Sequence, residues 1–216
     1  MNALVLQHQD DCPPGALADW AAARGVALTI ARPDRGELPE VSADAVVVLG
    51  SDRSVNDDEP WIAAELAWLG DVINSAPVLG ICFGAQALAV ALGGSVAREL
   101  PEIDWLTLAV DPALGCAAGP WLCWHNDFIT PPADATVLAR SGRAVHAFRC
   151  GAHLGVQFHP EVDTAIVETW MRADELGRDL ARAGVDHAAL RAATAEHAPR
   201  AAREAHALFD AFAARL

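Results

Sequence analysis

One cysteine stands between two glycines where a buried strand is predicted to meet a helix. The segment reads Gly80-Ile81-Cys82-Phe83-Gly84, which is the spacing of a nucleophile elbow with cysteine in place of serine. Because glycine has no Cβ atom, Gly80 and Gly84 let neighbouring backbones approach closely. The N-terminus of the following helix would stabilise a thiolate, and its free N–H groups could bind an oxyanion. The pattern therefore predicts a nucleophile at Cys82, although an isolated cysteine is more often a small buried hydrophobic residue.

A second segment could supply the base that such a nucleophile needs. In Gln157-Phe158-His159-Pro160-Glu161 a predicted strand ends at the histidine, and Pro160 stops the ladder of hydrogen bonds. His159 could receive the thiol proton, and Glu161 could hold the imidazole in its working tautomer. Gln157 and Phe158 are interpreted as ordinary strand residues.

Alternating strands and helices are predicted to position these two segments. Short apolar runs predict strands at residues 3–7, 26–31, 44–49 and 77–81. Helices are predicted at 60–69, capped by Asp57 or Asp58, and at 85–92. Short strands are expected between 95 and 157, and helix after Pro160. This order predicts an α/β fold: a single three-layer domain whose mostly parallel sheet carries helices on both faces.

Together, the two segments closely resemble the signatures of class I glutamine amidotransferases. That family has a Gly-x-Cys-x-Gly-x-Gln elbow and a Gln-Phe-His-Pro-Glu strand end, and both are complete in this chain. Further segments resemble the family: Leu6-Gln7-His8 with Pro14-Gly15, 54–57, Pro101-Glu102-Ile103-Asp104-Trp105 and Trp124-His125-Asn126-Asp127. The resemblance implies an amidotransferase domain over residues 1–172, similar to that of GMP synthetase, followed by a helical C-terminal extension over 173–216.

The resemblance also implies roles for individual residues. Cys82, His159 and Glu161 would form the catalytic triad, and no cofactor or metal would be needed. The backbone N–H groups of Phe83 and Ser51 would form the oxyanion hole, and Gln86 and Gly50 would help to bind L-glutamine. His125 and Asp127 are interpreted as residues that order a turn near the pocket.

Ser51 marks a departure from the family pattern. The family has Gly-Gly-Pro after the third strand, whereas this chain has Gly50-Ser51-Asp52. Serine cannot adopt every φ value that glycine adopts freely, and losing one oxyanion donor costs roughly 100- to 1,000-fold in rate. We therefore expect weak basal glutaminase activity that rises when a partner protein binds.

Composition excludes several other classes of function. The net charge is −14 and all 15 basic residues are arginine, because lysine is absent. An acidic surface disfavours binding to nucleic acid or to an anionic membrane, and the lack of lysine excludes Schiff-base and Walker-type chemistry. The five cysteines have no regular spacing, so they do not suggest a disulfide framework. The sequence shows no pattern of a signal peptide or a membrane-spanning segment, and together these features predict a cytoplasmic protein. Cys150 and His153 have a metal-like spacing but lack a second pair, and His8, His146, His187, His197 and His206 are interpreted as surface or core residues.

Three functions remain open from the sequence. The first is a glutaminase that supplies ammonia to a separate synthetase or other acceptor protein. The second is a stand-alone γ-glutamyl hydrolase that uses the same triad. The third is a catalytically weak binding or regulatory protein, which only the altered loop at Ser51 supports.

Overall fold

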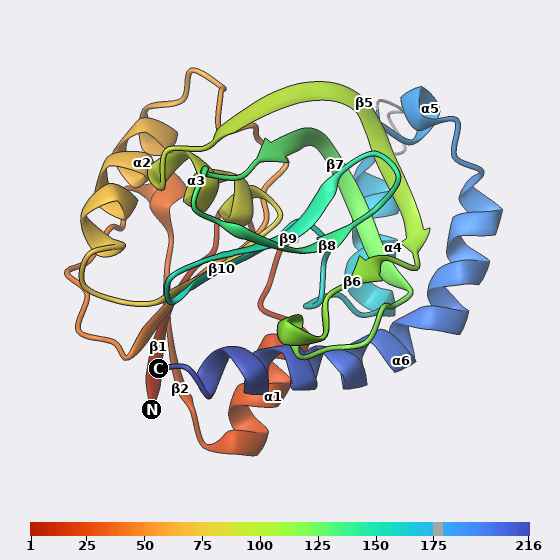
Figure 1. Ribbon diagram of the computed structural model, residues 1–216. Coiled ribbons are helices and arrows are strands. Elements are labelled where there is room, and N and C mark those ends of the chain that lie inside the picture. The colour runs from red at the N-terminus through yellow and green to blue at the C-terminus, as the bar shows by residue number, and fades with distance from the viewer. Residues whose placement is uncertain (175–178) are drawn as a thin grey trace.

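An eight-stranded sheet forms the centre of the computed structural model, which describes residues 1–174 and 179–216 (Figure 1). Five of its strands run parallel, in the order β2 (Ala27–Ala31), β1 (Asn2–Leu6), β3 (Ala45–Val48), β4 (Val78–Ile81) and β10 (His153–Val156). Three antiparallel strands complete the sheet: β9 (Val145–Cys150), β8 (Thr136–Arg140) and β6 (Ala109–Val110). The predicted α/β fold with a mostly parallel sheet is confirmed.

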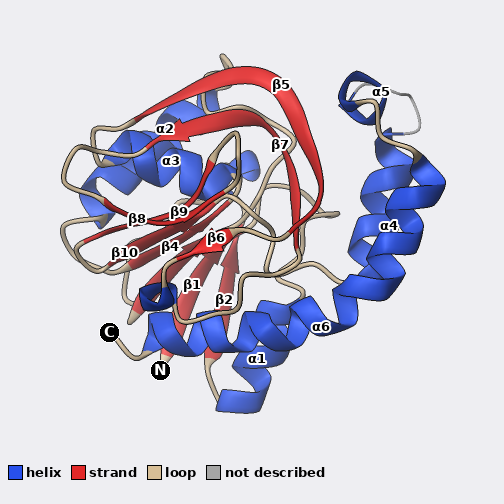
Figure 2. Cartoon of the chain, turned by 45° about the vertical axis from the view of Figure 1, so that its right-hand side comes forward, coloured by secondary structure: helices blue, strands red, loops and turns tan. Residues whose placement is uncertain are grey.

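Helices cover both faces of this sheet, as Figure 2 shows. Helices α1 (Ala16–Arg24) and α6 (His187–Ala213) pack on one face, and α2 (Pro60–Val72) and α3 (Phe83–Ala91) pack on the other. The period-2 geometry of a strand explains this arrangement, since successive side chains point to opposite faces. On β1, Val5 enters the core beneath α1 and α6, whereas Leu4 and Leu6 enter the core beneath α2 and α3.

Two long antiparallel strands form a separate sheet that arches beside the main one (Figures 1 and 2). They are β5 (Ser95–Leu106) and β7 (Trp121–Thr130), paired through a bulge between Arg98 and Glu102. The expectation of short strands in this region was wrong for these two, which have 12 and 10 residues. The expectation of a turn at 124–127 was also wrong, because His125 and Asp127 lie inside β7 and pair with residues of β5.

The start of α2 differs from its predicted cap. The N-cap residue is Glu59, without a side-chain hydrogen bond, and Pro60 occupies the first turn. Proline is suited to this position because its φ is already helical and it has no N–H that needs a partner. The Asp57 carboxylate instead accepts a hydrogen bond from the N–H of Ser54, at 3.0 Å, so neither Asp57 nor Asp58 caps the helix.

The chain is helical after Pro160, as expected, in α4 (Thr164–Ala173), α5 (Asp179–Ala183) and α6. Residues 175–178 of the predicted extension lie outside the described residues. Helix α6 packs on α1, where Trp20 donates to Asp210 at 2.8 Å and Phe209 contacts the Trp20 ring. The predicted boundary between residues 172 and 173 stays a prediction. No helix in the described part of the chain combines the length and the apolar character that a membrane span requires.

Candidate active site

The predicted elbow has the strained geometry that its glycines allow. Cys82 has a φ of 50°, and no other non-glycine residue in the described ranges has a positive φ. A Cβ on Gly80 would lie 2.3 Å from the carbonyl oxygen of Gly84, and a Cβ on Gly84 would lie 2.0 Å from that of Val48. Both distances are far below van der Waals contact. Glycine at these two positions therefore lets the chain turn from β4 directly into α3.

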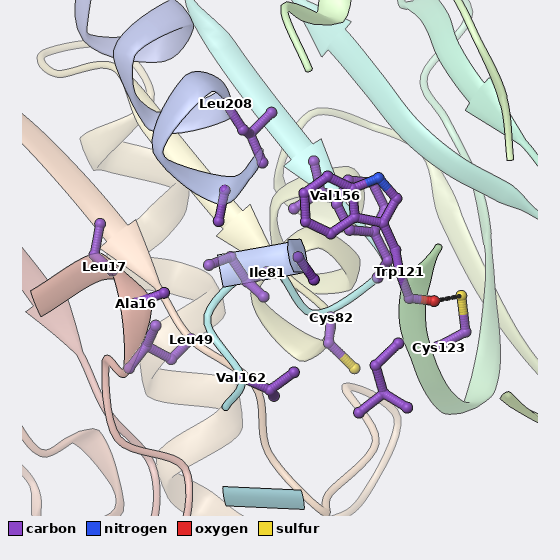
Figure 3. Packing of buried hydrophobic residues seen from close by; sticks show 14 of the residues in the cluster. Ala16, Leu17, Leu49, Ile81, Cys82, Trp121, Cys123, Val156, Val162 and Leu208 are labelled. Atoms are coloured by element: carbon purple, nitrogen blue, oxygen red, sulfur yellow. Dashed lines mark hydrogen bonds between the residues drawn. The ribbon is translucent and has the colours of Figure 1, made fainter. Parts of the chain in front are cut away.

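Neighbouring strands hold the elbow in place. The N–H of Cys82 donates to the carbonyl of Val156 at the end of β10, at 2.8 Å, and the N–H of Gly84 donates to that of Leu49, at 3.2 Å. The close view in Figure 3 shows Cys82 next to Ile81 among the buried residues, with Val162 and Cys123 on either side. Because β3, β4 and β10 are parallel neighbours, the segments that follow their carboxyl ends meet at one edge of the sheet.

His159 and Glu161 form a short, buried pair at this edge. Nδ1 of His159 lies 2.7 Å from Oε1 of Glu161, and both side chains are almost fully buried. Burial acts to lower the pKa of His159, but the charges of Glu161 and Cys82 outweigh it and raise this pKa well above its usual range. Trp170 packs edge-on against the imidazole, with ring centroids 4.8 Å apart. The site therefore favours a protonated His159 held in one orientation.

The Cys82 sulfur also contacts two groups that were not predicted from the sequence. The carbonyl oxygen of Trp124 lies 3.8 Å from Sγ and 3.4 Å from Nε2 of His159. The side-chain amide of Gln157 donates to Sγ at 3.6 Å. Gln157 was interpreted as an ordinary strand residue. Its position two residues before His159, and therefore on the same side of an extended segment, is the signal that could have identified it.

The other four cysteines are poor competitors for the role of nucleophile. Burial raises the pKa of Cys12 and Cys123 far above the ordinary value of a thiol, and it raises that of Cys116 to about 12. The pKa of Cys150 is raised by burial and by the neighbouring Asp134. These four side chains are therefore thiols at neutral pH, and a thiol is a much weaker nucleophile than a thiolate.

A cavity of about 440 Å³ opens onto the predicted nucleophile. Its wall includes Cys82, Gln86, Trp124, His159 and Trp170. The size lies within the usual range for small-molecule sites. Oε1 of Gln86 is buried and has no hydrogen-bond partner in the described part of the chain, so it could accept a hydrogen bond from a ligand.

Charged side chains of both signs line this cavity. Arginine side chains come from three separate segments: Arg53, Arg98 and Arg182. Carboxylates stand among them, including those of Asp57, Asp127 and Asp179. A zwitterionic amino acid carries a carboxylate and an ammonium group, and this mixture of charges suits both groups.

The loop after β3 is held from behind by a buried pair. Nδ1 of His8 lies 3.0 Å from the carbonyl oxygen of Gly50, and its Nε2 lies 3.0 and 3.2 Å from the two carboxylate oxygens of Glu65. A Cβ on Gly50 would lie 3.3 Å from Cε1 of His159, so this glycine packs directly against the imidazole. Ser51 follows and lines the cavity without a positive φ. The serine therefore needs no glycine-type conformation in this structure.

The structure thus brings most of the predicted site residues together. The structure places Cys82, His159 and Glu161 close together, next to Gly50. Phe83 is the first residue of the helix that follows Cys82. Ser51 and Gln86 line the same cavity. Asp127, from the segment expected to form a turn, lines it too, and its carboxylate lies 3.3 Å from Nε of Arg98. His125 borders the cavity, but its Nε2 faces Glu102 at 3.2 Å.

Comparisons with known proteins identify the family of the chain. The model of the family "glutamine amidotransferase class-I" matches residues 15–174. A GMP synthase [glutamine-hydrolyzing] from Corynebacterium jeikeium is 35% identical over 138 residues, which are 58% of this chain and 25% of that protein. The matched region of the chain thus spans about a quarter of the length of this curated relative.

Solved structures extend the similarity over the whole chain. A glutamine amido transferase from Methylobacillus flagellatus has a TM-score of 0.88 at 26% identity, covering 100% of this chain and 95% of that one. A glutamine amidotransferase from Thermotoga maritima has a TM-score of 0.86 at 22% identity, covering 98% and 97%, and this match shows the fold alone. The protein belongs to the class I glutamine amidotransferase family, whose members are cysteine-dependent amidohydrolases.

Proposed function

We propose that the protein hydrolyses the side-chain amide of L-glutamine, with Cys82 as nucleophile, His159 as acid and base, and Glu161 as the residue that orients His159. One observation carries this proposal. The cysteine stands at an elbow with a φ of 50°, in the wall of a cavity, beside an imidazole that a buried carboxylate holds at 2.7 Å. Nucleophile, base and orienting group are the three parts that covalent amide hydrolysis requires.

The reaction would proceed through a thioester. The Cys82 thiolate attacks the amide carbon and forms a tetrahedral intermediate. His159 then gives its proton to the nitrogen as the carbon–nitrogen bond breaks, which releases ammonia and leaves the γ-glutamyl thioester. His159, now neutral, takes a proton from water, and the resulting hydroxide attacks the thioester and releases glutamate and the thiolate. The raised pKa of His159 supports its role as the acid in the first half of the reaction.

Two backbone N–H groups would stabilise the oxyanion of the intermediate. Phe83 occupies the first position of α3, where an N–H has no partner within the helix. The second donor would be the N–H of Ser51, whose peptide carbonyl, that of Gly50, points toward His8. Because the C=O and N–H of a trans peptide point in opposite directions, the bond to His8 favours an N–H directed away from His8.

The polar groups of the cavity would select the substrate. Gln86 presents an amide oxygen without a partner in the described residues, and the arginines and carboxylates that line the cavity suit the α-carboxylate and α-ammonium groups of an amino acid. We propose that the ammonia passes to a synthetase or other acceptor enzyme outside these 216 residues. The relative from Corynebacterium jeikeium, which is named a glutamine-hydrolysing synthase, supports this coupling. Five unpaired cysteines fit a reducing cytoplasm as the place of action.

The decisive experiment combines turnover with covalent labelling. In one assay, purified protein is supplied with L-glutamine, and the release of ammonia and glutamate is measured. In a parallel assay, the substrate is γ-glutamyl-p-nitroanilide, a γ-glutamyl compound with a different leaving group, and the release of p-nitroaniline is measured. We expect equimolar ammonia and glutamate, and a glutamine-analogue diazoketone should add mass to the peptide that contains Cys82. Release of p-nitroaniline without release of ammonia would favour a γ-glutamyl hydrolase. Labelling of any other cysteine, with Cys82 unmodified, would contradict the proposed nucleophile.

A further inference from the structure

Three buried side chains from three strands direct ligand atoms at one point beside the active site. Glu102 of β5 pairs across the strand with His125 of β7, and His146 comes from β9 of the main sheet. Oε2 of Glu102 lies 3.2 Å from Nε2 of His125 and 2.9 Å from Nε2 of His146. The three ligand atoms all lie within 4.8 Å of one another. We call this group the Glu–His–His cluster.

Each member of the cluster is fixed from behind by a second contact. Nδ1 of His125 donates to the carbonyl oxygen of Asp127 at 3.0 Å. Nδ1 of His146 contacts Sγ of Cys123 at 3.6 Å, and Oε1 of Glu102 accepts from the Ser141 hydroxyl at 3.1 Å. Metal-binding histidines and carboxylates are typically held by such outer contacts, which fix the tautomer and the ring orientation.

The hydrogen-bond roles leave one atom of the cluster without a suitable neighbour. A carbonyl oxygen only accepts, so the hydrogen of a neutral His125 must sit on Nδ1, and its Nε2 presents a lone pair. That lone pair lies 3.2 Å from a carboxylate oxygen, and Nε2 has no hydrogen-bond partner in the described residues. Two acceptors at this distance repel each other, whereas a cation placed between them is attracted to both.

The dimensions and the ligand types fit one class of ion. Zinc binds histidine nitrogen and carboxylate oxygen at roughly 2.0–2.2 Å, which places neighbouring ligands of a tetrahedron about 3.3–3.6 Å apart. The two separations from Glu102, 3.2 and 2.9 Å, are slightly shorter, so a small outward movement of the side chains would accommodate the ion. Two imidazoles and one carboxylate suit Zn²⁺ or Co²⁺, whereas Ca²⁺ and Mg²⁺ prefer a shell made of oxygen atoms.

We propose that Glu102, His125 and His146 bind one divalent transition-metal ion of the Zn²⁺ type. The ion ties the β5–β7 pair to β9 of the main sheet, and β7 also carries the Trp124 carbonyl that contacts Cys82. It therefore stabilises a wall of the cavity and takes no part in the attack on glutamine. The three residues lie at positions 102, 125 and 146, too far apart to form a compact metal-binding motif in the sequence. They come together only in the folded protein.

A test must separate this site from Cys82 and His159, because a thiolate and an imidazole also attract zinc. Metal-free Cys82→Ala protein is titrated with Zn²⁺ by calorimetry, and with Co²⁺ by visible absorption. The matched variant is Cys82→Ala/His146→Gln, in which the glutamine amide still donates to Glu102 but binds zinc poorly. Cys82→Ala/His206→Gln removes a histidine of α6 outside the cluster and serves as the control. A cooperative thermal unfolding transition in each metal-free variant verifies that all three proteins are folded.

We expect one Zn²⁺ per chain in the Cys82→Ala protein and in the His206 control. Affinity in the His146 variant should fall by more than the roughly 10- to 100-fold that loss of an outer contact costs. At a free Zn²⁺ concentration of 100 times Kd, Tm of the Cys82→Ala protein should rise by roughly 5–10 °C. The proposal is overturned if Zn²⁺ binds the wild type but not Cys82→Ala, if it binds neither, or if His146→Gln leaves the affinity unchanged. None of these measurements requires glutaminase activity, so the result is independent of the proposed function.

Discussion

The bond between His8 and the Gly50 carbonyl allows a sharp test of how the oxyanion hole is built. His8 lies behind the loop, stacked on Trp61 and edge-on to Phe83, with ring centroids 5.3 and 4.8 Å away. Its Nδ1 holds the Gly50 carbonyl at 3.0 Å. If the N–H of Ser51 stabilises the oxyanion, release of this carbonyl lets the peptide rotate, and the rate of the chemical step falls.

The size of the effect follows from the strength of one hydrogen bond. With His8 protonated opposite Glu65, the bond involves a charged donor, and such a bond contributes roughly 1.5–3 kcal/mol; about 1.4 kcal/mol corresponds to a tenfold change in an equilibrium constant. Loss of the bond should therefore lower kcat by roughly 10- to 100-fold, below the 100- to 1,000-fold that complete loss of an oxyanion donor costs. The KM for glutamine should change little, because the oxyanion exists in the transition state and not in the bound substrate.

The variant must remove both buried polar partners at once. His8→Phe alone would leave the Glu65 carboxylate buried and unpaired, and breaking such a pair costs roughly 3–5 kcal/mol of stability. His8→Phe/Glu65→Leu replaces both groups with apolar side chains and keeps an aromatic ring between Trp61 and Phe83. Steady-state ammonia release then gives kcat and KM, and thermal unfolding verifies the fold.

Glu65→Gln provides the matched control. Its side-chain N–H can donate to Nε2 of a neutral His8, whose Nδ1–H still donates to the Gly50 carbonyl, so kcat should stay close to that of the wild type. A folded double variant with wild-type kcat would refute the reasoning. So would a double variant whose loss of activity lies in KM alone, because that result would assign His8 to substrate binding.

Three further predictions concern the elbow and the triad. Iodoacetamide at neutral pH should modify Cys82 before the other cysteines, whose pKa values are raised; peptide mass spectrometry measures the order, and faster modification of another cysteine contradicts it. Glu161→Gln removes a charge that raises the pKa of His159, so the alkaline limb of the pH profile of kcat should move to lower pH; an unmoved limb would assign it to another group. Gly84→Ala places a Cβ 2.0 Å from the Val48 carbonyl and should destabilise the fold by at least roughly 1–3 kcal/mol, whereas Gly70→Ala, with no neighbour within 4 Å inside α2, should stabilise it by roughly 0.4–1 kcal/mol; equal Tm values for the two variants would contradict the steric argument.

The sequence alone identified the elements of the fold that depend on short segments. Nearly continuous apolar runs identified β1, β3 and β4, because a strand buried on both faces leaves little room for polar residues. The elbow was equally readable, since the glycines flanking Cys82 are required by contacts within a few residues and by the neighbouring strand. The alternation of strands and helices then predicted the α/β layers.

Tertiary structure decided the pairing and the ends of several segments. The segment 124–127 resembles a turn of the family, yet it lies inside β7 because β5 pairs with it on both sides of the bulge. Asp57 was predicted as a possible helix cap, but α2 begins at Pro60 and its N-cap residue is Glu59. The Asp57 carboxylate accepts a hydrogen bond from the N–H of Ser54 instead. Long-range strand pairing thus decided the structure of the first segment, and one proline decided the start of the helix in the second.

The surroundings of the site also came from the fold rather than from the sequence. Gln157 contacts the Cys82 sulfur, and His8, which pairs with Glu65, holds the Gly50 carbonyl. His146 was interpreted from the sequence only as a surface or core residue, whereas in the structure it contacts Glu102. The physical reason is that a turn is determined by sterics between near neighbours in the chain. The convergence of side chains from separate strands depends instead on the register and packing of whole elements, which no single segment contains.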